Sequence, residues 1–152
     1  MAYIAEESHD VHQESGCPFC AMRAPHDNDL VVKRGEHCFA VLNLHPYNPG
    51  HLMVLPWRHV AGLEDLTPEE SAELMALTQQ AVVTLKRVST PHAFNVGLNL
   101  GSAAGGSLAA HLHQHVVPRW NGDANFITVV GRTKTLPQLL GDTADLLRTK
   151  WA

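Results

Sequence analysis

A histidine stands at every second position of one seven-residue stretch, His111-Leu112-His113-Gln114-His115-Val116-Val117. Side chains alternate between the two faces of a β-strand, so this spacing predicts a strand with three imidazoles in a row on one face. The valines at the end of the stretch also favour a strand. Successive imidazoles on that face would lie about 7 Å apart, close enough for neighbouring rings to act on one ligand.

The histidine row has simpler interpretations, namely a solvated face, a metal-collecting face or a cloning tag. Its internal position and the strand-forming valines beside it argue against a tag. Histidine clusters are usually sites of chemistry or metal binding, because imidazole offers a free electron pair and changes charge near neutral pH. The chain has 11 histidines, so we expect its chemistry to begin with this row.

The segments around the row predict an α+β fold, with an antiparallel sheet of about five strands and two main helices. Apolar runs predict strands at residues 30–33, 37–42, 51–55, 94–98 and 111–117. Thr67, Pro68 and Glu70 form a typical helix start, and apolar residues at helical spacing continue that helix. A last helix is expected over residues 137–150. The strands cluster instead of alternating with helices, which favours an α+β layer over βαβ units.

Length and composition limit the organisation of the chain. With 152 residues and 45% hydrophobic composition, it can close one core, so we expect a single domain over residues 17–152 after a mobile polar tail at residues 1–16. The net charge of -4 and the lack of a dense Lys/Arg run argue against binding of long nucleic acids. No signal peptide or membrane span is expected, and three cysteines then favour a cytoplasmic protein over a secreted disulfide scaffold.

The row and its surroundings resemble the signature of the histidine-triad superfamily of nucleotide hydrolases and transferases. Three segments carry the likeness: the row with Pro118-Arg119-Trp120 after it, the stretch Pro49-Gly50-His51-Leu52-Met53-Val54-Leu55-Pro56, and the glycine-rich loop from Gly101 to Ser107. The likeness extends from Cys17 to about Phe126. Gln114 departs from the family pattern, in which this position is usually apolar, so that face of the strand is expected to be less buried or to contact a polar group.

The resemblance implies that His113, the middle histidine, attacks the α-phosphorus of a nucleotide and forms a nucleotidyl-histidine intermediate. A physical argument supports the same role. A neutral imidazole has a lone pair on one nitrogen, and a carbonyl that accepts from the other nitrogen would fix this tautomer. His115 is expected to hydrogen-bond a phosphate oxygen and help the leaving group depart, and His111 completes the triad.

The resemblance also implies which residues bind the nucleotide. Asn43 matches a ribose contact of the family, although Asn at a strand end also begins turns. Asn99 matches an amide that contacts the α-phosphate, and His51 is expected to lie near the site, either supporting it or as an ordinary edge histidine. Successive amides of the glycine-rich loop can form an anion-binding nest, although such loops are often simple connections. Its expected contributors are Gly105, Gly106 and Ser107.

Cys17-Pro18-Phe19-Cys20 has the spacing of a metal knuckle, in which two thiolates share one tetrahedral ion. A thioredoxin-like redox pair is an alternative, although its βαβ context is missing, and an unmetallated pair of thiols is another. Some branches of the triad family, and the related hexose-phosphate uridylyltransferases, complete such a site with two histidines. By that likeness the ligands of a structural Zn²⁺ would be Cys17, Cys20, His59 and His111.

Residues 118–126 and 137–140 resemble the family branch that acts on diadenosine polyphosphates, especially the actinobacterial-type diadenosine tetraphosphate phosphorylases. The resemblance implies an adenine dinucleoside polyphosphate as substrate, water or inorganic phosphate as acceptor, no organic cofactor, and a homodimer. Arg119 and Trp120 are candidates to steer or stack the second nucleotide. Two alternatives stay open, an adenosine 5'-phosphoramidase that uses the same His113 and a non-catalytic nucleotide-binding sensor.

Overall fold

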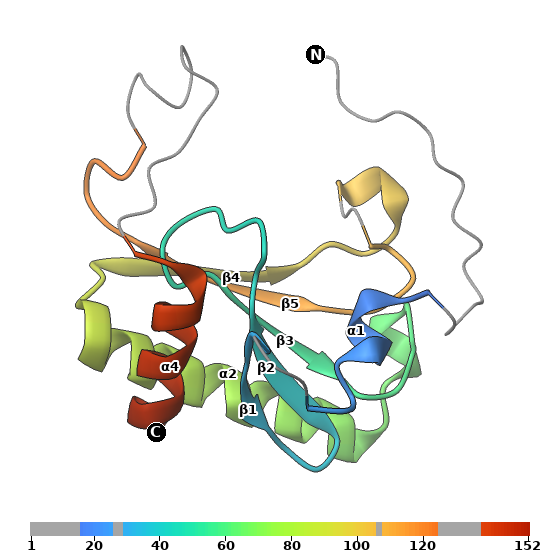
Figure 1. Cartoon of the computed structure of the whole chain (residues 1–152). Helices are drawn as coiled ribbons and strands as arrows, with labels where there is room; N and C mark the ends of the chain where they lie inside the picture. Colours follow the sequence, from blue (N-terminus) through green and yellow to red (C-terminus); the bar gives the residue numbers. More distant parts are fainter. Residues whose placement is uncertain (1–15, 26–28, 106–107, 125–137) are drawn as a thin grey trace.

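The computed structural model of the protein describes residues 16–25, 29–105, 108–124 and 138–152. Within these ranges, five strands form one antiparallel sheet in the order β1-β2-β3-β5-β4 (Figure 1). They are β1 (Val31–Arg34), β2 (Cys38–Leu42), β3 (Leu52–Pro56), β4 (Ala93–Leu98) and β5 (Gln114–Arg119). The sheet and its helices confirm the predicted α+β fold. The tail expected at residues 1–16 lies outside the described residues except for Gly16.

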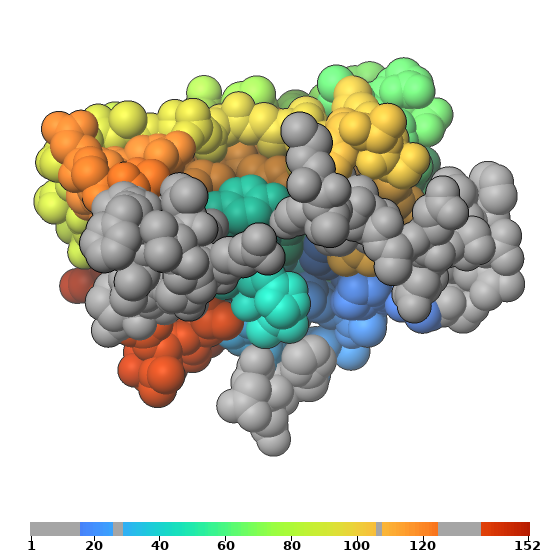
Figure 2. All heavy atoms as spheres, turned by 90° about the horizontal axis from the view of Figure 1, so that it is seen from above, coloured from blue at the N-terminus to red at the C-terminus, as the bar shows by residue number. Residues whose placement is uncertain are grey.

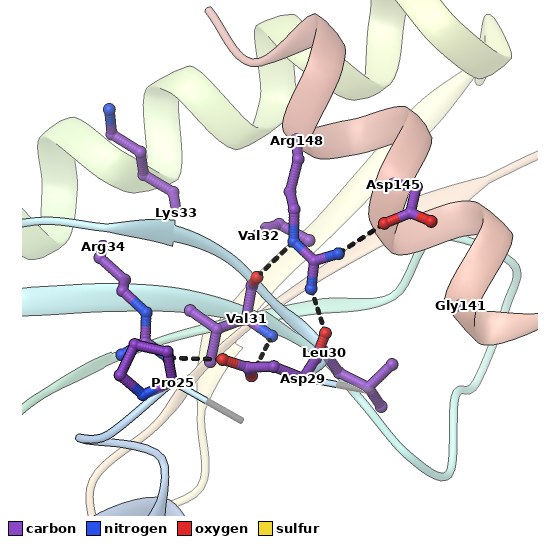
Figure 3. A pocket seen from close by; sticks show the side chains of 10 residues that line it. All are labelled: Pro25, Asp29, Leu30, Val31, Val32, Lys33, Arg34, Gly141, Asp145 and Arg148. Atoms are coloured by element: carbon purple, nitrogen blue, oxygen red, sulfur yellow. Dashed lines mark hydrogen bonds and ion pairs between the residues drawn. The ribbon is translucent and has the colours of Figure 1, made fainter. Parts of the chain in front are cut away.

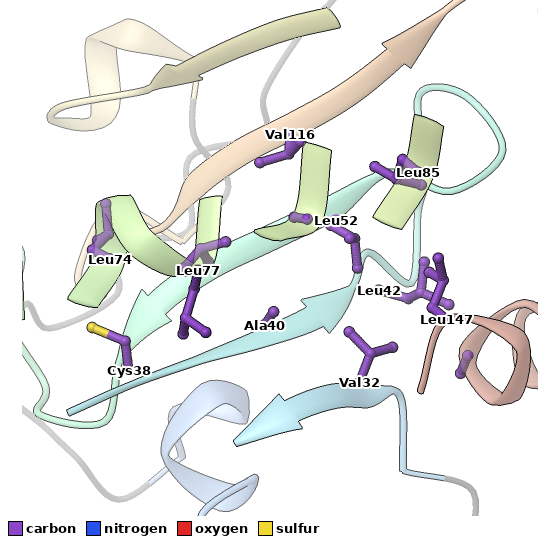
Figure 4. Close-up of a cluster of buried hydrophobic side chains, with 13 residues drawn as sticks. Val32, Cys38, Ala40, Leu42, Leu52, Leu74, Leu77, Leu85, Val116 and Leu147 are labelled. Carbon is purple, nitrogen blue, oxygen red and sulfur yellow. The ribbon is translucent and has the colours of Figure 1, made fainter. Parts of the chain in front are cut away.

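The long helix α2 (Pro68–Ser89) covers one face of the sheet (Figure 1). It begins as the sequence predicts, because the Thr67 hydroxyl accepts from the Glu70 amide at 3.2 Å and the Glu70 carboxylate accepts from the Thr67 amide at 2.9 Å. Its apolar stripe packs against the sheet and against α4 (Leu140–Lys150) in one buried cluster (Figure 4). The cluster includes Val32, Ala40, Leu42, Leu52, Val54, Leu74, Leu77, Ala81, Leu85, Val116 and Leu147.

The other face of the sheet carries a second apolar cluster, beneath the one-turn helix α1 (Pro18–Ala21). Its members are Phe19, Val31, Phe39, Val41, Met53 and Leu55. Because both faces are covered, every residue of β2 and β3 is buried. On β5, Val116 belongs to the α2 side, so His115 points to the side of α1. The ring of His115 therefore lies on the face of the sheet that α2 does not cover.

The strand β5 begins at Gln114, three residues later than the sequence predicts. In the pairing of β5 with its neighbour β3, Gln114 lies opposite Val54, and no earlier residue of the row pairs with β3. Before that point, the Leu112 amide donates to the Val60 carbonyl at 2.6 Å, outside any regular ladder. The alternation of side chains nevertheless continues, since Gln114 contacts α2 and the rings of His113 and His115 lie 5.0 Å apart.

The helix α4 packs along the edge strand β1. Arg148 donates to the carbonyl of Val31 at 2.8 Å and to the carbonyl of Asp29, which satisfies backbone groups at this edge of the sheet. The helix expected over residues 137–150 begins at Leu140, and residue 137 lies outside the described part of the chain. Two short 3₁₀ turns, η1 (Leu63–Asp65) and η2 (Ser102–Ala104), complete the described elements. None of the described helices has the length and apolar character needed to cross a membrane.

Candidate active site and metal centre

The backbone holds the middle histidine of the row, His113, just before β5. Its Nδ1 lies 2.8 Å from the carbonyl oxygen of His111. A carbonyl oxygen only accepts hydrogen bonds, so Nδ1 carries the proton and Nε2 carries the lone pair of the neutral ring. The residue is 7% exposed, which keeps water away from most of the ring. This is the tautomer that attack through Nε2 requires.

The third histidine of the row, His115, carries its proton on Nε2, the opposite tautomer to that of His113. The buried His51 imposes this tautomer. The backbone N–H of Tyr47 donates to His51 Nδ1 at 3.0 Å, so the proton of His51 must be on Nε2. His51 Nε2 lies 2.9 Å from His115 Nδ1 and donates to it, which leaves the proton of His115 on its own Nε2. Among the described residues this shielded Nε2 has no hydrogen-bond partner. It is a buried N–H that a ligand oxygen can satisfy.

Burial keeps this donor uncharged. It lowers the pKa of His115 to about 4, and the neighbouring His113 acts in the same direction. The ring of His115 is therefore neutral near pH 7. The rings of His113 and His115 meet edge to face with their centroids 5.0 Å apart, so one site has a lone pair and an N–H donor side by side.

Asn43 and Asn99 flank this pair from two different strands. Asn43 follows β2, where its Oδ1 accepts from the His45 amide at 2.9 Å and its Nδ2 lies 3.4 Å from His51 Nδ1. Asn43 therefore forms the turn and also lies beside His51, while its contact with a ribose stays a prediction. Asn99 is half-buried directly after β4, in which Gly97 pairs with His115. Both amides lie on segments next to the histidine pair.

Only part of the glycine-rich loop falls within the described residues. Gly101 and Gly105 have φ angles of +77° and +87° on either side of η2, a conformation that residues with a Cβ rarely adopt. The Gly105 amide donates to the Ser102 carbonyl at 3.2 Å. Gly106 and Ser107 lie outside the described residues. Their part in the expected anion-binding nest therefore stays a prediction from the sequence.

Two aromatic residues that the sequence analysis did not single out also contact the histidines. Tyr47 lies on the loop between β2 and β3, which Figure 2 shows in turquoise on the same face as the orange and yellow residues of β5 and β4. Its ring centroid lies 4.7 Å from that of His51 and 5.8 Å from that of His115. Phe19 is buried, with its centroid 5.5 Å from those of both His111 and His113. The only sequence signal for Phe19 is its place inside the cysteine motif.

Gln114, which departs from the family pattern, is buried and contacts a polar group. Its Nε2 donates to the Thr78 hydroxyl of α2 at 2.7 Å, and that hydroxyl donates to the Leu74 carbonyl at 2.7 Å. The sequence predicts that this face of the strand is either less buried or in contact with a polar group. The polar contact is found, and the position is buried. Gln114 therefore joins the strand to α2 on the side away from the histidines.

Arg119 and Trp120 use their polar groups to hold the turn after β5. Arg119 donates to both carboxylate oxygens of Asp123 at 2.7 and 2.9 Å, and to the Asn95 side chain at 2.7 Å. The Arg119 guanidinium holds the pKa of Asp123 far below its usual range. Trp120 Nε1 donates to the Ser89 carbonyl at 3.3 Å. A contact of Arg119 or Trp120 with a second nucleotide stays a prediction, and these bonds give it no support.

Cys17, Cys20, His59 and His111 come together into one cluster, here called the metal centre. Their ligand atoms all lie within 4.8 Å of one another. Cys17 Sγ is 3.4 Å from His111 Nδ1, and Cys20 Sγ is 3.3 Å from His59 Nδ1. Cys17 precedes the single turn of α1 as its N-cap residue and Cys20 lies within it, and Pro18 starts the helix at a position where a missing N–H is harmless. The sequence motif and the fold together bring four suitable donors to one point.

The residues of the metal centre fit a tetrahedral ion. His111 Nε2 donates to the Pro56 carbonyl at 2.9 Å, so His111 Nδ1 directs its lone pair toward the sulfur atoms. Such an outer hydrogen bond to a backbone carbonyl is typical of metal-binding histidines. Two sulfur and two nitrogen donors also form a recognised structural set. The cluster can therefore hold a metal ion.

A cavity of about 850 Å³ lies apart from these histidines, between β1 and α4 (Figure 3). Its arginines are already paired, since Arg34 contacts Asp29 and Arg148 contacts Asp145. Figure 3 shows these groups turned toward one another across the cavity wall. Both arginines of the lining are therefore engaged by carboxylates, and Lys33 is the remaining cationic residue of the described lining.

An antiparallel sheet that presents a row of three histidines beside an upstream histidine defines a protein of the histidine-triad class. The family model described as HIT domain matches residues 25–122. The chain therefore belongs to the HIT domain family, and the resemblance stated from the sequence is confirmed.

Known relatives and solved structures agree with this assignment. The chain is 68% identical over 126 residues to the AP-4-A phosphorylase of Mycobacterium tuberculosis, a match that spans 83% of this chain and 65% of that relative. It is 37% identical over 93 residues to the asymmetrical bis(5'-nucleosyl)-tetraphosphatase of Schizosaccharomyces pombe, across 61% of this chain and 50% of the relative. It is also similar to the Zn-bound histidine triad family protein of Mycobacterium smegmatis, with a TM-score of 0.71, 29% identity, and coverage of 90% of this chain and 93% of the other.

Proposed function

We propose that this protein cleaves dinucleoside polyphosphates at an α-phosphorus, through a nucleotidyl intermediate on His113. The observation that carries the proposal is the complementary state of two neighbouring rings, with a lone pair on His113 Nε2 and a proton on His115 Nε2. Displacement at phosphorus needs a nucleophile on one side and stabilisation of the departing oxygen. Similarity to an AP-4-A phosphorylase and an asymmetrical tetraphosphatase supports this choice of substrate.

In the first step, His113 Nε2 forms a bond to the α-phosphorus and the bond from phosphorus to the bridging oxygen breaks. The leaving polyphosphate takes the bonding electrons, and the His115 N–H donates a hydrogen bond to an oxygen that gains charge. The His113 ring becomes positively charged in the nucleotidyl adduct. The His111 carbonyl, already 2.8 Å from Nδ1, stabilises that charge.

In the second step, an acceptor oxygen attacks the same phosphorus, and the nitrogen–phosphorus bond returns its electrons to His113. With inorganic phosphate as acceptor, diadenosine tetraphosphate yields ADP and ATP, and with water it yields AMP and ATP. We propose phosphate, because the 68% identical relative is named a phosphorylase. In both cases His113 ends in its starting tautomer.

The nucleotide is bound in this proposal by groups around the histidine pair. Asn43 contacts the ribose and Asn99 contacts the α-phosphate, while the glycine-rich loop with Gly105, Gly106 and Ser107 contacts phosphate oxygens. His51 acts mainly by fixing the tautomer of His115, as its bonds with the Tyr47 amide and with His115 support. The neighbouring positions of Asn43 and His51 support a ribose subsite beside the leaving-group donor.

We further propose that the metal centre holds a structural Zn²⁺, because two thiolates and two imidazoles are the set that zinc prefers. Four protein ligands close the coordination shell, so the ion would supply cross-linking rather than a site for substrate. The solved M. smegmatis relative, described as Zn-bound, supports the choice of metal.

A homodimer and a cytoplasmic location stay predictions. Exposed apolar residues on the edge strand β4 and on α2 support a dimer, since Val96 is 48% exposed and Met75 is 50% exposed. Sedimentation of the purified protein would test the dimer directly.

The test of the proposed function is product analysis with diadenosine tetraphosphate, with and without inorganic phosphate. The wild type is compared with His113→Ala and with His37→Ala, a histidine on the turn between β1 and β2. We expect ADP and ATP only when phosphate is present, no turnover by His113→Ala, and normal turnover by His37→Ala.

Other products would change the assignment. AMP and ATP without phosphate would mean a hydrolase. Faster turnover of an adenosine phosphoramidate than of the dinucleotide would mean a phosphoramidase. Nucleotide binding without any turnover that depends on His113 would contradict an enzymatic function and favour a sensor.

A further inference from the structure

His111 belongs to two sites at once. Its side chain points Nδ1 at the sulfur atoms of the metal centre, 3.4 Å from Cys17 and 3.7 Å from Cys20. Its backbone carbonyl accepts the hydrogen bond from His113 Nδ1 at 2.8 Å. Any displacement of His111 therefore also moves the group that fixes the nucleophile.

Phe19 forms a second connection between the two sites. It lies between Cys17 and Cys20 on α1, and its ring packs against His111 and His113 with both centroid distances at 5.5 Å. The residue is 5% exposed, so it fills space beside the nucleophile that would otherwise be open. The turn that carries both thiols thus presses an aromatic ring against His113.

We infer that the metal centre, when filled by zinc, positions the nucleophile through these two contacts, and that Phe19 is a positioning residue for His113. The inference rests on the proposed role of His113. Two routes lead from the four ligands to the same imidazole, one through a backbone carbonyl and one through a packed ring. The ion would therefore affect catalysis by geometry, although substrate does not reach it.

If the metal only stabilised the fold, its removal should detach α1 and leave the site otherwise unchanged. Other contacts, however, also attach α1 to the sheet. Arg34 donates to the Met22 carbonyl at 2.8 Å, and Arg23 donates to the Trp57 carbonyl at 2.8 Å. The large core under α2 shares no residue with the metal centre. Removing the ion should thus leave the fold largely in place while the thiols, Phe19 and His111 gain freedom of movement.

The test uses the full-length protein in three states: loaded with one zinc per chain, stripped by a chelator, and reloaded. Nitrogen NMR of the histidine rings reports whether His113 keeps its proton on Nδ1 in a stable hydrogen bond, independently of activity. We expect one sharp Nδ1–H state for His113 in the loaded protein and exchange between states in the stripped protein. With diadenosine tetraphosphate, kcat should fall about tenfold or more on stripping, while KM changes less.

Variants separate positioning from metal binding. Phe19→Ala should retain one zinc per chain and still lose about tenfold in kcat, with Phe19→Leu recovering part of the loss. Cys20→Ser should lose zinc and reproduce the stripped state. The control is Cys38→Ala, because Cys38 is a buried thiol of β2 outside the metal centre, and it should keep both zinc and turnover.

The outcomes are distinct. If stripped protein and zinc-loaded Phe19→Ala keep the His113 hydrogen-bond signal and the wild-type kcat, the metal centre is only structural and the inference is wrong. If the loaded wild type turns over no dinucleotide, the proposed function fails, and the NMR comparison still decides whether the metal positions His113.

Discussion

The metal centre and the His113–His115 pair both contain histidines from the same row, and they differ in where the ring protons lie. In the metal centre, the Pro56 carbonyl takes the proton of His111 Nε2, so the free lone pair faces the thiols. In the pair, the His111 carbonyl holds the proton on His113 Nδ1, so His113 Nε2 has a lone pair. The Tyr47 amide acts through His51 and leaves His115 with an N–H at Nε2. Converging lone pairs suit a cation, whereas a lone pair beside a donor suits a phosphoryl group.

This difference shows that the backbone, more than the histidines themselves, assigns each ring its chemistry. A backbone carbonyl forces a proton onto the nitrogen it faces, and a backbone amide forces a lone pair. Each buried ring then has one nitrogen left for a ligand, and the identity of that nitrogen decides what the site can bind.

The largest effect is expected from removing the lone pair of His113, which distinguishes the His113–His115 pair from the metal centre. His113→Ala should reduce kcat for diadenosine tetraphosphate by at least about 10⁴-fold, since the proposed mechanism has no second nucleophile. The fold should persist, which circular dichroism and nucleotide binding will check. Turnover within tenfold of the wild type would mean that another residue or water attacks the phosphorus.

A smaller effect is expected from removing the group that places the proton on His115. His51→Ala should lower kcat about 10²-fold, because His115 Nδ1 loses its donor and the ring can exchange tautomers. Nitrogen NMR should show a mixture of His115 tautomers in this variant. The matched control is His45→Ala on the same loop, which is exposed. Equal loss in both variants would point to a general disturbance of the loop.

Substitutions on the face of β5 that packs against α2 should change the free energy of unfolding and leave kcat unchanged. Thr78→Val leaves the buried amide of Gln114 without its partner, so we expect a loss of about 1–3 kcal/mol in the free energy of unfolding. Gln114→Val removes the amide, while Thr78 keeps its bond to the Leu74 carbonyl, so a change within about 1 kcal/mol is expected. Urea unfolding and kcat measure both effects. A large fall in kcat for Gln114→Val would show that the two faces are coupled.

The smallest effect concerns the pH dependence of stability. The folded pKa of His115, about 4, is below the usual 6.5, so between these values the folded protein binds fewer protons than the unfolded chain. Its contribution to stability is thus complete above about pH 6.5 and is lost as the pH falls toward 4. Urea unfolding at pH 7 and pH 5 should show a smaller decline for His115→Asn than for the wild type. Equal declines would mean that His115 is not buried in neutral form.

Much of this architecture follows from local sequence patterns. The period-two histidine row, the apolar runs and the Thr67–Glu70 capping box predict the sheet and α2, because these signals depend on neighbouring residues in the chain. The cluster of Cys17, Cys20, His59 and His111 followed from the family likeness. These elements needed no knowledge of distant backbone groups.

The protonation pattern of the site could not be predicted in the same way. It depends on the Tyr47 amide and the Pro56 carbonyl, which are main-chain groups that carry no sequence signature. The start of β5 at Gln114 was likewise missed, because it depends on where β3 stops pairing. The contact of Phe19 with His113 depends on how α1 packs, which the cysteine spacing alone does not define.

The central claim is that His113 presents the reactive lone pair, and trapping the intermediate tests it most directly. Wild-type protein is mixed with diadenosine tetraphosphate without phosphate, quenched within milliseconds in alkali, digested and analysed by mass spectrometry, with His115→Asn as a second sample. The account predicts an adenylyl group on the peptide that contains His113, attached at that residue, in both samples. An adenylyl group on another residue, or no adduct in either sample from protein that forms ADP at full rate once phosphate is added, would contradict it.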